Sequence, residues 1–273
     1  ARGRCFEATK NIMKGFYVYC IRPQLANAFP VKAKGVEFAK SIKVFPFKAI
    51  EAIVGKLDRK IDGAEIKNKL LTDPKWAEAN ILRHHEVIDR MFQKSAVIPM
   101  KFGIMYKTEK SLAGMLAKHY PKFKDLIFQL RDKKEWGVKA YFDRKKFIES
   151  LKKKNKEIQI LEKRRSAAPE GMRWYIERKI DEIIAQESEE EIKKELRHLI
   201  GKLEKYSEKA RLNKALAKDM ILNAACLVKN NSLPSFSAFF HKLAKDTASN
   251  GIKLEITGPW PPYNFVEIKH EKA

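Results

Sequence analysis

The stretch GFYVYCIR, residues 15–22, has the β-branched and aromatic content that is typical of a β-strand. Two similar stretches follow it, SIKVFPF at 41–47 and AIEAIVGKL at 49–57. Pro46 cannot donate a hydrogen bond to a central ladder, so we expect it between these strands or at a sheet edge. The folded part of the chain is therefore expected to begin with a three-stranded sheet.

Two helices are predicted after these strands. Asp73 is a favourable N-cap and Pro74 suits the first helical position, which together predict a helix start. Thr108 predicts the start of a second helix, and Pro121 predicts a kink or break within it.

Extended stretches lie between and after the two helices. AVIPMKFGIMY, residues 96–106, separates the helices, and EWGVKAYF, residues 135–142, follows the second one and is expected to close this unit as a strand. The order of three strands, helix, strand, helix and strand predicts an α+β sandwich with its helices on one face of the sheet.

The composition changes after Asp143. Between residues 151 and 211, 30 of 61 residues are charged, with both signs interleaved. Ser188 and Glu191 have the spacing of a capping box, which indicates that a new helix starts there. The spacing of the apolar residues indicates two short coiled-coil seams that suit an intramolecular hairpin. The seam positions are Ile176, Ile180, Ile183, Ile192, Leu196, Leu199 and Leu203.

The last part of the chain again predicts both strands and a helix. KARLNKALA at 209–217 and MILNAACLVKN at 220–230 resemble a strand pair, and a helix is expected from Ser232 or Ser235 to Gly251. IKLEITG, residues 252–258, alternates between apolar and polar residues as a strand does.

These patterns predict two α+β domains. The expected divisions are a flexible N-terminal tail at 1–14, an N-terminal domain at 15–143, a C-terminal domain at 144–266 whose coiled-coil helices span about 144–205, and a C-terminal tail at 267–273.

The net charge of +23 is concentrated in the first half, where residues 1–150 hold 32 Lys and Arg against 16 Asp and Glu. Such a field favours acidic partners, which makes nucleic acid a candidate. The signature of the RNA-recognition motif is absent, however, and the lysines are scattered rather than clustered. Nucleic-acid binding is therefore kept only as the alternative function.

No stretch has the spacing of a catalytic or metal-binding motif. Cys5, Cys20 and Cys226 fit no zinc or disulfide framework, which favours a reducing cytoplasm. His84 and His85 are adjacent and diverge on a helix, so we interpret His85 as a helix residue that is satisfied locally, with Asp89 as a candidate hydrogen-bond partner. We expect no enzymatic activity, no metal and no cofactor.

The C-terminal string ITGPWPPYNF, residues 256–265, combines turn, rigid and aromatic residues. Gly258 allows a turn, and Pro261-Pro262 favours a short polyproline II segment. Two interpretations remain open: an internal latch over the second domain or the domain junction, with Trp260 buried, or an exposed docking strip for a partner.

Three of these stretches resemble, in order and spacing, the signatures of the gas vesicle protein F/L family (GvpF/GvpL). They are PMKFG at 99–103, EWGVKAYF at 135–142 and LEITGPWPPYNF at 254–265. HHEVID at 84–89 also fits, and the resemblance runs from about Phe16 to Val266. Met100 and Lys101 stand where the family tends to have Leu and Arg.

The resemblance implies two ferredoxin-related α+β domains, the second with a charged coiled-coil helical insertion. It also implies a non-enzymatic accessory or minor structural protein of the gas vesicle, in the cytoplasm, with no cofactor. Such a protein would assist assembly by binding the small hydrophobic shell protein, and other accessory proteins are further candidate partners. We expect neither nucleic-acid nor membrane binding, and we favour strand edges of the first domain for docking.

The motif positions that match this sequence are candidates for structural or interaction roles. They are His85, Pro99, Phe102, Gly103, Trp136, Gly137, Lys139, Gly258, Pro259, Trp260, Pro261, Pro262, Tyr263 and Phe265.

Overall fold

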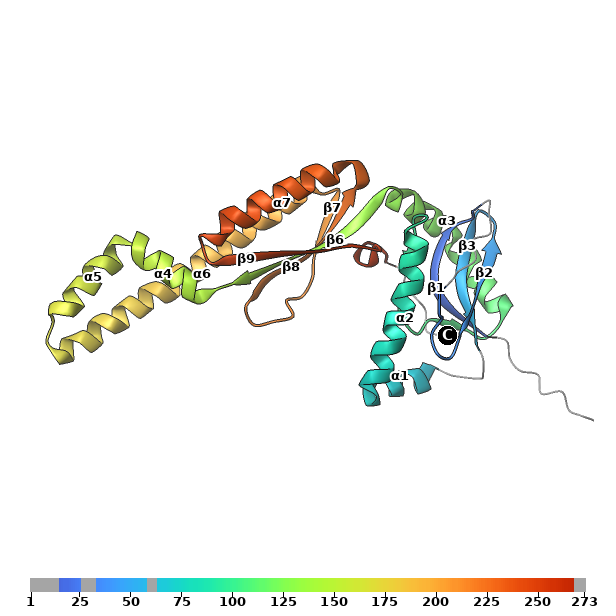
Figure 1. The fold of residues 1–273 in the computed structure, drawn as a ribbon, viewed down its shortest axis with the longest axis horizontal. Helices are drawn as coiled ribbons and strands as arrows, with labels where there is room; N and C mark the ends of the chain where they lie inside the picture. Colours follow the sequence, from blue (N-terminus) through green and yellow to red (C-terminus); the bar gives the residue numbers. More distant parts are fainter. Residues whose placement is uncertain (1–14, 26–32, 58–62, 268–273) are drawn as a thin grey trace, which may run out of the picture. The chain divides into compact units, whose positions relative to one another are not determined.

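The computed structural model describes residues 15–25, 33–57 and 63–267, which form two compact units (Figure 1). The first unit runs to Asp132 and also contains the chain from Pro261 onward, and the second comprises Lys133–Trp260. Each unit has one antiparallel sheet with helices packed against it, which confirms the predicted α+β class.

The first sheet contains the three predicted strands. Its path is β2-β3-β1-β4, with β5 also paired to β1. Pro46 lies in β2, the edge strand, as its missing N–H predicts. The strands are β1 (Phe16–Pro23), β2 (Ser41–Phe47), β3 (Ile50–Lys56), β4 (Ile98–Pro99) and β5 (Met105–Tyr106).

The two predicted helix starts are confirmed. The Asp73 side chain accepts from the Trp76 N–H at 3.0 Å, and Thr108 forms a capping box with Ser111. The second helix continues through Pro121 without ending there. The helices of this unit are α1 (Gly63–Thr72), which was not predicted, α2 (Pro74–Phe92) and α3 (Glu109–Leu130).

Helices cover both faces of the first sheet, which corrects the expectation of one covered face. Every residue of β1 from Phe16 to Arg22 is buried, and both α2 and α3 contact this strand. The hydrophobic cluster around Tyr17 and Tyr19 includes α2 and excludes the buried residues of α3, which lie on the other face. The near-continuous apolar run of β1 is the pattern of a strand with two buried faces.

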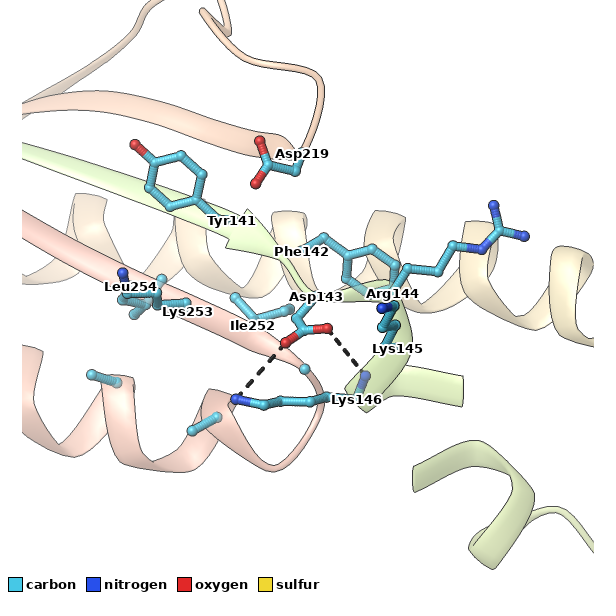
Figure 2. Close-up of a pocket in the computed structure, with 13 residues that line it drawn as sticks. Tyr141, Phe142, Asp143, Arg144, Lys145, Lys146, Asp219, Ile252, Lys253 and Leu254 are labelled. Carbon is cyan, nitrogen blue, oxygen red and sulfur yellow. Dashed lines mark hydrogen bonds and ion pairs between the residues drawn. The ribbon is translucent and has the colours of Figure 1, made fainter. Parts of the chain in front are cut away.

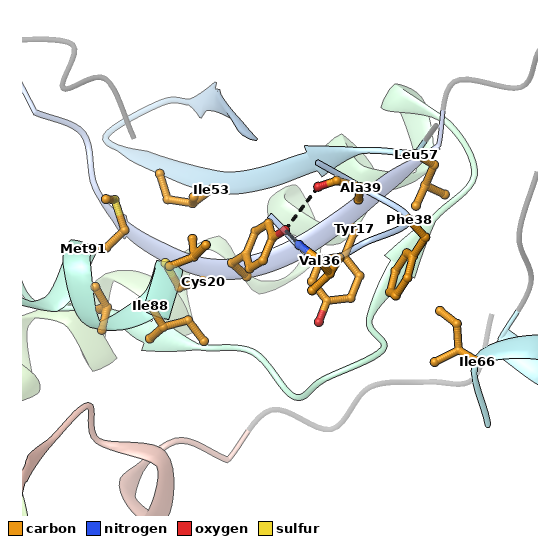
Figure 3. Close-up of a cluster of buried hydrophobic side chains, with 13 residues drawn as sticks. Tyr17, Cys20, Val36, Phe38, Ala39, Ile53, Leu57, Ile66, Ile88 and Met91 are labelled. Carbon is orange, nitrogen blue, oxygen red and sulfur yellow. Dashed lines mark hydrogen bonds between the residues drawn. The ribbon is translucent and has the colours of Figure 1, made fainter. Parts of the chain in front are cut away.

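Two tyrosines organise the core on the α2 side of the sheet (Figure 3). The Tyr19 hydroxyl accepts from the Val36 N–H at 2.9 Å and donates to the Ala39 carbonyl at 3.3 Å. These bonds fasten the segment before β2 to the sheet, and Phe38 from that segment packs edge-on against Tyr17. The segment is therefore part of the core.

A buried ion pair joins β1 to β3. Arg22 and Glu51 are opposite each other in the ladder, and the Arg22 Nε donates to the Glu51 Oε1 at 2.7 Å. The Arg22 side chain also reaches the Met91 sulfur of α2 at 3.1 Å. Both charged side chains are almost fully buried, so each charge depends on the other to offset the cost of its removal from water.

The second sheet has the strand order β7-β8-β6-β9. Its central strand β6 contains EWGVKAYF, which corrects the prediction that this stretch closes the first unit. Pairs run along nearly the whole strand, to β8 on one side and to β9 on the other. These partners lie far along the chain, so local sequence order could not reveal them. The strands are β6 (Lys133–Phe142), β7 (Lys209–Leu212), β8 (Met220–Lys229) and β9 (Ile252–Trp260).

The charged segment forms a helical hairpin, in which α5 packs against the first part of α6 (Figure 1). Its arms differ from the expectation, because the two predicted seams do not face each other. The contact of α5 with α6 buries Ile158, Leu161, Ile176, Ile180 and Ile184. The helices of this unit are α4 (Arg144–Lys154), α5 (Lys156–Ala167), α6 (Glu170–Tyr206) and α7 (Leu233–Ala248), and two short 3-10 helices, η1 (Asn230–Ser232) and η2 (Tyr263–Phe265), complete the described chain.

A single helix of 37 residues, α6, carries both apolar seams. The prediction of a new helix at Ser188 is wrong, because the Ser188 hydroxyl is buried and donates to the Ile184 carbonyl one turn earlier. Leu199 and Leu203, further along, join α7 and the sheet in the core of the second unit. One helix thus belongs to the hairpin at its start and to the sheet layer at its end.

The division into units differs from the predicted boundary after Asp143. The chain passes between the units at Asp132/Lys133 and again at Trp260/Pro261. The change in composition marks the start of the helical hairpin, which is a part of the second unit. The predicted tail at 1–14 lies outside the described residues, and only Glu267 of the tail at 267–273 is described.

Replacing Glu51 with Ala is expected to lower the free energy of unfolding by about 3–5 kcal/mol, because it leaves the Arg22 guanidinium buried without its partner. Chemical denaturation followed by circular dichroism measures the change. Glu86 in the exposed Glu86–Arg90 pair is the matched control, and Glu86→Ala should cost about 0.5 kcal/mol or less. Equal effects of the two substitutions would contradict the assigned role of the buried pair.

Candidate functional site

The C-terminal string divides between the two units. Its first part, through Trp260, extends β9, whereas the chain from Pro261 onward belongs to the first unit. Pro261, Pro262 and Phe265 are buried, while Trp260 is 45% exposed. The last part of the string is therefore packed within the chain, as a latch would be, but against the first unit and not over the second domain, and Trp260 is not the buried residue.

His85 on α2 is the hydrogen-bond partner of Tyr263. The His85 Nδ1 lies 2.6 Å from the Tyr263 hydroxyl, and the two rings pack edge-on. The expected local partner, Asp89, acts on His85 only as a nearby charge. Partial burial lowers the pKa of His85, and Asp89 opposes this shift. The interpretation of His85 as locally satisfied is therefore wrong, because its hydrogen-bond partner lies 178 positions along the chain.

His84 lies deeper than His85 and has two buried partners. Its Nε2 is 3.0 Å from the Met100 carbonyl, which can only accept, so Nε2 carries the proton. Its Nδ1 then accepts from the Tyr17 hydroxyl at 2.8 Å, and the Tyr17 oxygen accepts from the Gly103 N–H at 3.4 Å. Burial lowers the pKa of His84 to about 4, so the imidazole is neutral at neutral pH.

Aromatic rings enclose these two histidines. Phe102 packs edge-on against His84 with 5.6 Å between ring centroids, and Tyr19 stacks on the same imidazole at 5.7 Å. We call this set the histidine–aromatic cluster: Tyr17, Tyr19, His84, His85, Phe102 and Tyr263. It joins β1, α2, the PMKFG loop and the C-terminal segment, so three of the motif stretches meet in one place.

Two further residues of the PMKFG stretch support this cluster from the backbone. Pro99 in β4 pairs with Cys20 of β1. Gly103 has a φ of +90°, a backbone conformation in which a residue with a side chain would be strained. Its N–H donates to the Tyr17 hydroxyl oxygen. The loop therefore passes close to the cluster at a position where glycine is required.

Six further motif residues belong to the second unit, where β6 meets β9. A side chain at Gly137 would meet the Thr257 hydroxyl oxygen at 2.7 Å, and that oxygen accepts from the Trp260 Nε1 at 3.2 Å. Gly258 has a φ of +125° where β9 turns beside the Glu135 carbonyl. The residues of this group are Trp136, Gly137, Lys139, Gly258, Pro259 and Trp260.

A cleft of about 580 Å³ opens at the end of the second sheet (Figure 2). Small residues create it, since Ala244, Ala248 and Gly251 line it beside Ile252 and Leu254. Asp143 in the cleft caps α4 by accepting from the Lys146 N–H at 3.1 Å. Arg144, Lys145, Lys146 and Lys253 also line the cleft, and the Lys146 Nζ lies 3.8 Å from the Asp143 Oδ2.

The two described cysteines are buried, and burial raises the pKa of each thiol to about 12. Within residues 15–25, 33–57 and 63–267, no three His, Cys, Asp or Glu side chains are grouped so as to hold a metal ion. In the same ranges no helix is both long and apolar enough to span a bilayer.

Sequence reasoning missed Tyr17, His84 and the pair Arg22–Glu51. A signal for the pair was present, because Arg22 is the lone charge in β1 and Glu51 is the lone acidic residue in β3, and both strands are otherwise largely apolar. Two opposite charges in such strands are compatible with burial only if they pair. The role of His84 had no comparable local signal, because its partners come from β1 and from the loop after β4.

Comparisons with known proteins agree along the whole described chain. The family described as "Gas vesicle synthesis protein GvpL/GvpF" matches residues 15–267. Gas vesicle protein F2 of Halobacterium salinarum is 21% identical over 247 residues, which cover 89% of this chain and 88% of that protein. Gas vesicle protein L of a Streptomyces species is 23% identical over 265 residues, which cover 93% and 94%.

Two solved structures share the fold. The crystal structure of gas vesicle protein GvpF from an Anabaena species has a TM-score of 0.69 at 15% identity, covering 95% of this chain and 99% of that chain. GvpF from Microcystis aeruginosa has a TM-score of 0.63 at 16% identity, with 93% and 99% covered. At this level of identity the likeness shows a shared fold.

Acid is expected to destabilise the first unit through His84. The unfolded imidazole takes up a proton below its ordinary pKa of about 6.5, whereas the folded one does so only near 4. Stability contributed by the neutral form is therefore complete above pH 6.5 and decreases by about 3 kcal/mol as the pH falls to 4. Denaturation curves at several pH values measure this loss.

The variant His84→Gln should flatten that pH dependence, and His241→Gln, an exposed position on α7, should leave it unchanged. A variant lacking His84 that keeps the full dependence between pH 6.5 and 4 would contradict the assignment.

Phe265→Ala is expected to cost about 3 kcal/mol, because Phe265 is 8% exposed. Trp260→Ala should cost about 1 kcal/mol or less, because nearly half of that side chain already contacts water. Thermal unfolding of both variants tests the order. If Trp260→Ala lowers the stability more than Phe265→Ala does, the tryptophan and not Phe265 anchors the C-terminal string.

Proposed function

The chain belongs to the GvpL/GvpF family of gas vesicle synthesis proteins, and from that premise we propose that it assists gas vesicle assembly by binding the small hydrophobic shell protein. The observation that carries the proposal is the extent of the family match, residues 15–267, which includes both units and both groups of motif residues. A gas vesicle role thus applies to the whole described chain, and the binding of the shell protein is the specific step proposed here.

Assembly of a hydrophobic shell poses a problem of solubility. Free shell subunits with apolar surface aggregate in water, so a partner that covers this surface until a subunit is added would aid assembly. A net charge of +23 would keep a loaded complex dispersed by mutual repulsion. The proposed location follows from this role: the gas vesicle and its assembly intermediates in the cytoplasm.

One edge of each sheet carries residues that discourage strand addition. In the first unit the edge strand β2 carries Lys43 and Pro46, and both residue types discourage the pairing of another strand. In the second unit the edge strand β9 carries Lys253 and Pro259. This weakens the initial preference for strand edges of the first domain.

We assign the motif residues a supporting role in this function. His85 and Tyr263 hold the C-terminal segment against α2, and Gly137 and Gly258 allow β6 and β9 to approach closely. Their effect on binding would then be indirect, through the stability of each unit. No catalytic step is part of the proposal.

Nucleic-acid binding is the alternative, and only the positive charge favours it. Salt separates the two functions, because binding to phosphates weakens steeply as salt rises, whereas apolar contact does not. Other accessory proteins of the gas vesicle are further proposed partners.

We expect the full chain to capture the purified shell protein at both about 50 mM and about 500 mM salt. The two concentrations differ about tenfold because the affinity for phosphates falls with the logarithm of the salt concentration. A co-precipitation assay with tagged chain measures this, and a duplex DNA of random sequence is the control ligand. Deleting the gene from a gas-vesicle-forming host should also abolish or deplete vesicles. Capture of shell protein that disappears at high salt, or normal vesicles after deletion, would contradict the proposal.

A further inference from the structure

The buried face of α6 changes its chemistry halfway along the helix. The first three buried residues pack with α5 in the hydrophobic cluster of the hairpin, and the last two pack with α7 and the sheet. The two between them, Ser188 and Glu195, are polar. We call residues 185–195 the polar joint. In chain order the buried residues are Ile176, Ile180, Ile184, Ser188, Glu195, Leu199 and Leu203.

No hydrophobic cluster spans the polar joint. Within the described residues, the cluster of the hairpin and the cluster on the sheet share no member. Ile192 is the only apolar residue of the joint besides Ala185, and it is half-buried and belongs to neither cluster. Most of the stability of a helix in a protein comes from packing of its apolar face. The joint is therefore held less firmly than the parts of α6 on either side of it.

Polar contacts take the place of packing at the joint. The Glu195 Oε1 accepts from the Asn250 Nδ2 at 3.0 Å, and the Glu187 Oε1 accepts from the Asn155 Nδ2 at 3.4 Å. The net contribution of such hydrogen bonds to stability is small, because water offers equivalent bonds when they break. They therefore resist bending of the helix less than a packed apolar core would.

A cleft beside the joint gives water access to it. The cleft has a volume of about 340 Å³ and opens between α4 and α6. Lys154 lines it from α4, and Glu187, Glu191 and Lys194 line it from α6. A cleft of this size with polar walls can admit water. The helix α4 therefore does not seal the joint from solvent.

Local contacts keep the joint helical but easy to bend. The Ser188 hydroxyl donates to the Ile184 carbonyl one turn earlier. Such a bond slightly destabilises a helix and often bends it, because the hydroxyl competes with a backbone N–H for the same carbonyl. The ion pair between Glu189 and Lys193, one turn apart, stabilises the helical form. The joint is thus a continuous piece of helix with little resistance to bending.

The other chain connection to the hairpin lies beside the joint. Asn155 ends α4 and also caps α5, and its extended backbone separates the two helices. The bond from Asn155 to Glu187 places this break next to the joint. The contact that opposes bending is the packing of Ile148 and Leu151 of α4 on the hairpin, and both side chains are only half-buried. Both connections of the hairpin are therefore weak at the same place.

We propose that the polar joint is a hinge, about which α5 and the first part of α6 move as one body relative to the sheet of the second unit (Figure 1). The moving body keeps its own hydrophobic cluster, and the later part of α6 stays packed on the sheet through Leu199 and Leu203. The hinge does not depend on the function proposed above, so the failure of either leaves the other standing.

Amide hydrogen exchange of the full chain, followed by mass spectrometry, tests the hinge. We expect the amides of residues 185–195 to exchange at least about tenfold faster than those of 176–184 and 196–203, because local opening is most frequent where packing is absent. All three stretches belong to one helix, so its flanks are the internal reference. A joint that is protected as strongly as both flanks would overturn the proposal.

Two matched double variants test the cause of the faster exchange. Ser188→Ala with Glu195→Leu makes the buried face of the joint apolar, and Ser166→Ala with Glu204→Leu makes the same changes at exposed positions outside it. We expect the joint variant to slow the exchange of residues 185–195 about tenfold and the control to leave it unchanged. Equal effects of the two variants would overturn the proposal. If the joint variant does not fold, Ser188→Ala alone should still slow this exchange, and an unchanged rate would contradict the hinge.

Distances between spin labels, measured by pulsed electron paramagnetic resonance, detect the motion itself. Lys163→Cys on α5 with Lys242→Cys on α7 reports the hairpin against the sheet layer, and Lys205→Cys with Lys242→Cys is the control pair within that layer. The labels are placed in a Cys5→Ser background, because the two described cysteines are buried. We expect a broad distance distribution for the first pair, which the joint variant narrows, and a narrow one for the control. A first pair as narrow as the control would overturn the hinge.

Discussion

Burial of β1 on both faces is the constraint on which the first unit depends. A strand covered on two sides cannot expose its polar groups to water, so each must find a partner inside the protein. Tyr17 bonds His84, Tyr19 bonds the segment before β2, and Arg22 pairs with Glu51. These bonds bring α2, β3 and two connecting segments to the strand, and the PMKFG loop follows through the Met100 carbonyl and the Gly103 N–H.

The second unit follows a different rule, in which one long helix serves two purposes. The later part of α6 packs on the sheet with α7, and its first part pairs with α5. Because the helix is continuous, the helical hairpin is carried on an element that is anchored in the core of the second unit.

Local signals predicted much of the fold and little of the candidate site. Strand composition at β1, β2 and β3 and the caps at Asp73 and Thr108 depend on neighbours within a few residues, so the sequence contains the whole signal. The capping pattern at Ser188 failed because the buried face of α6 that starts at Ile176 includes Ser188 itself, and packing of that face outweighs a cap. The bond between His85 and Tyr263 joins residues 178 positions apart, and no local pattern encodes such a contact.

The sequence by itself determined the α+β class, the helical character of the charged segment and the family resemblance, since these rest on composition, periodicity and motif order along the chain. Only the tertiary structure decided that β6 is the central strand of the second sheet and that Pro261–Phe265 belongs to the first unit. It also decided which apolar side chains stay in water, leaving Trp174 exposed and burying Ile176. The physical reason is that burial and pairing are settled by competition among distant segments for the same surface, and composition cannot show which segment reaches that surface.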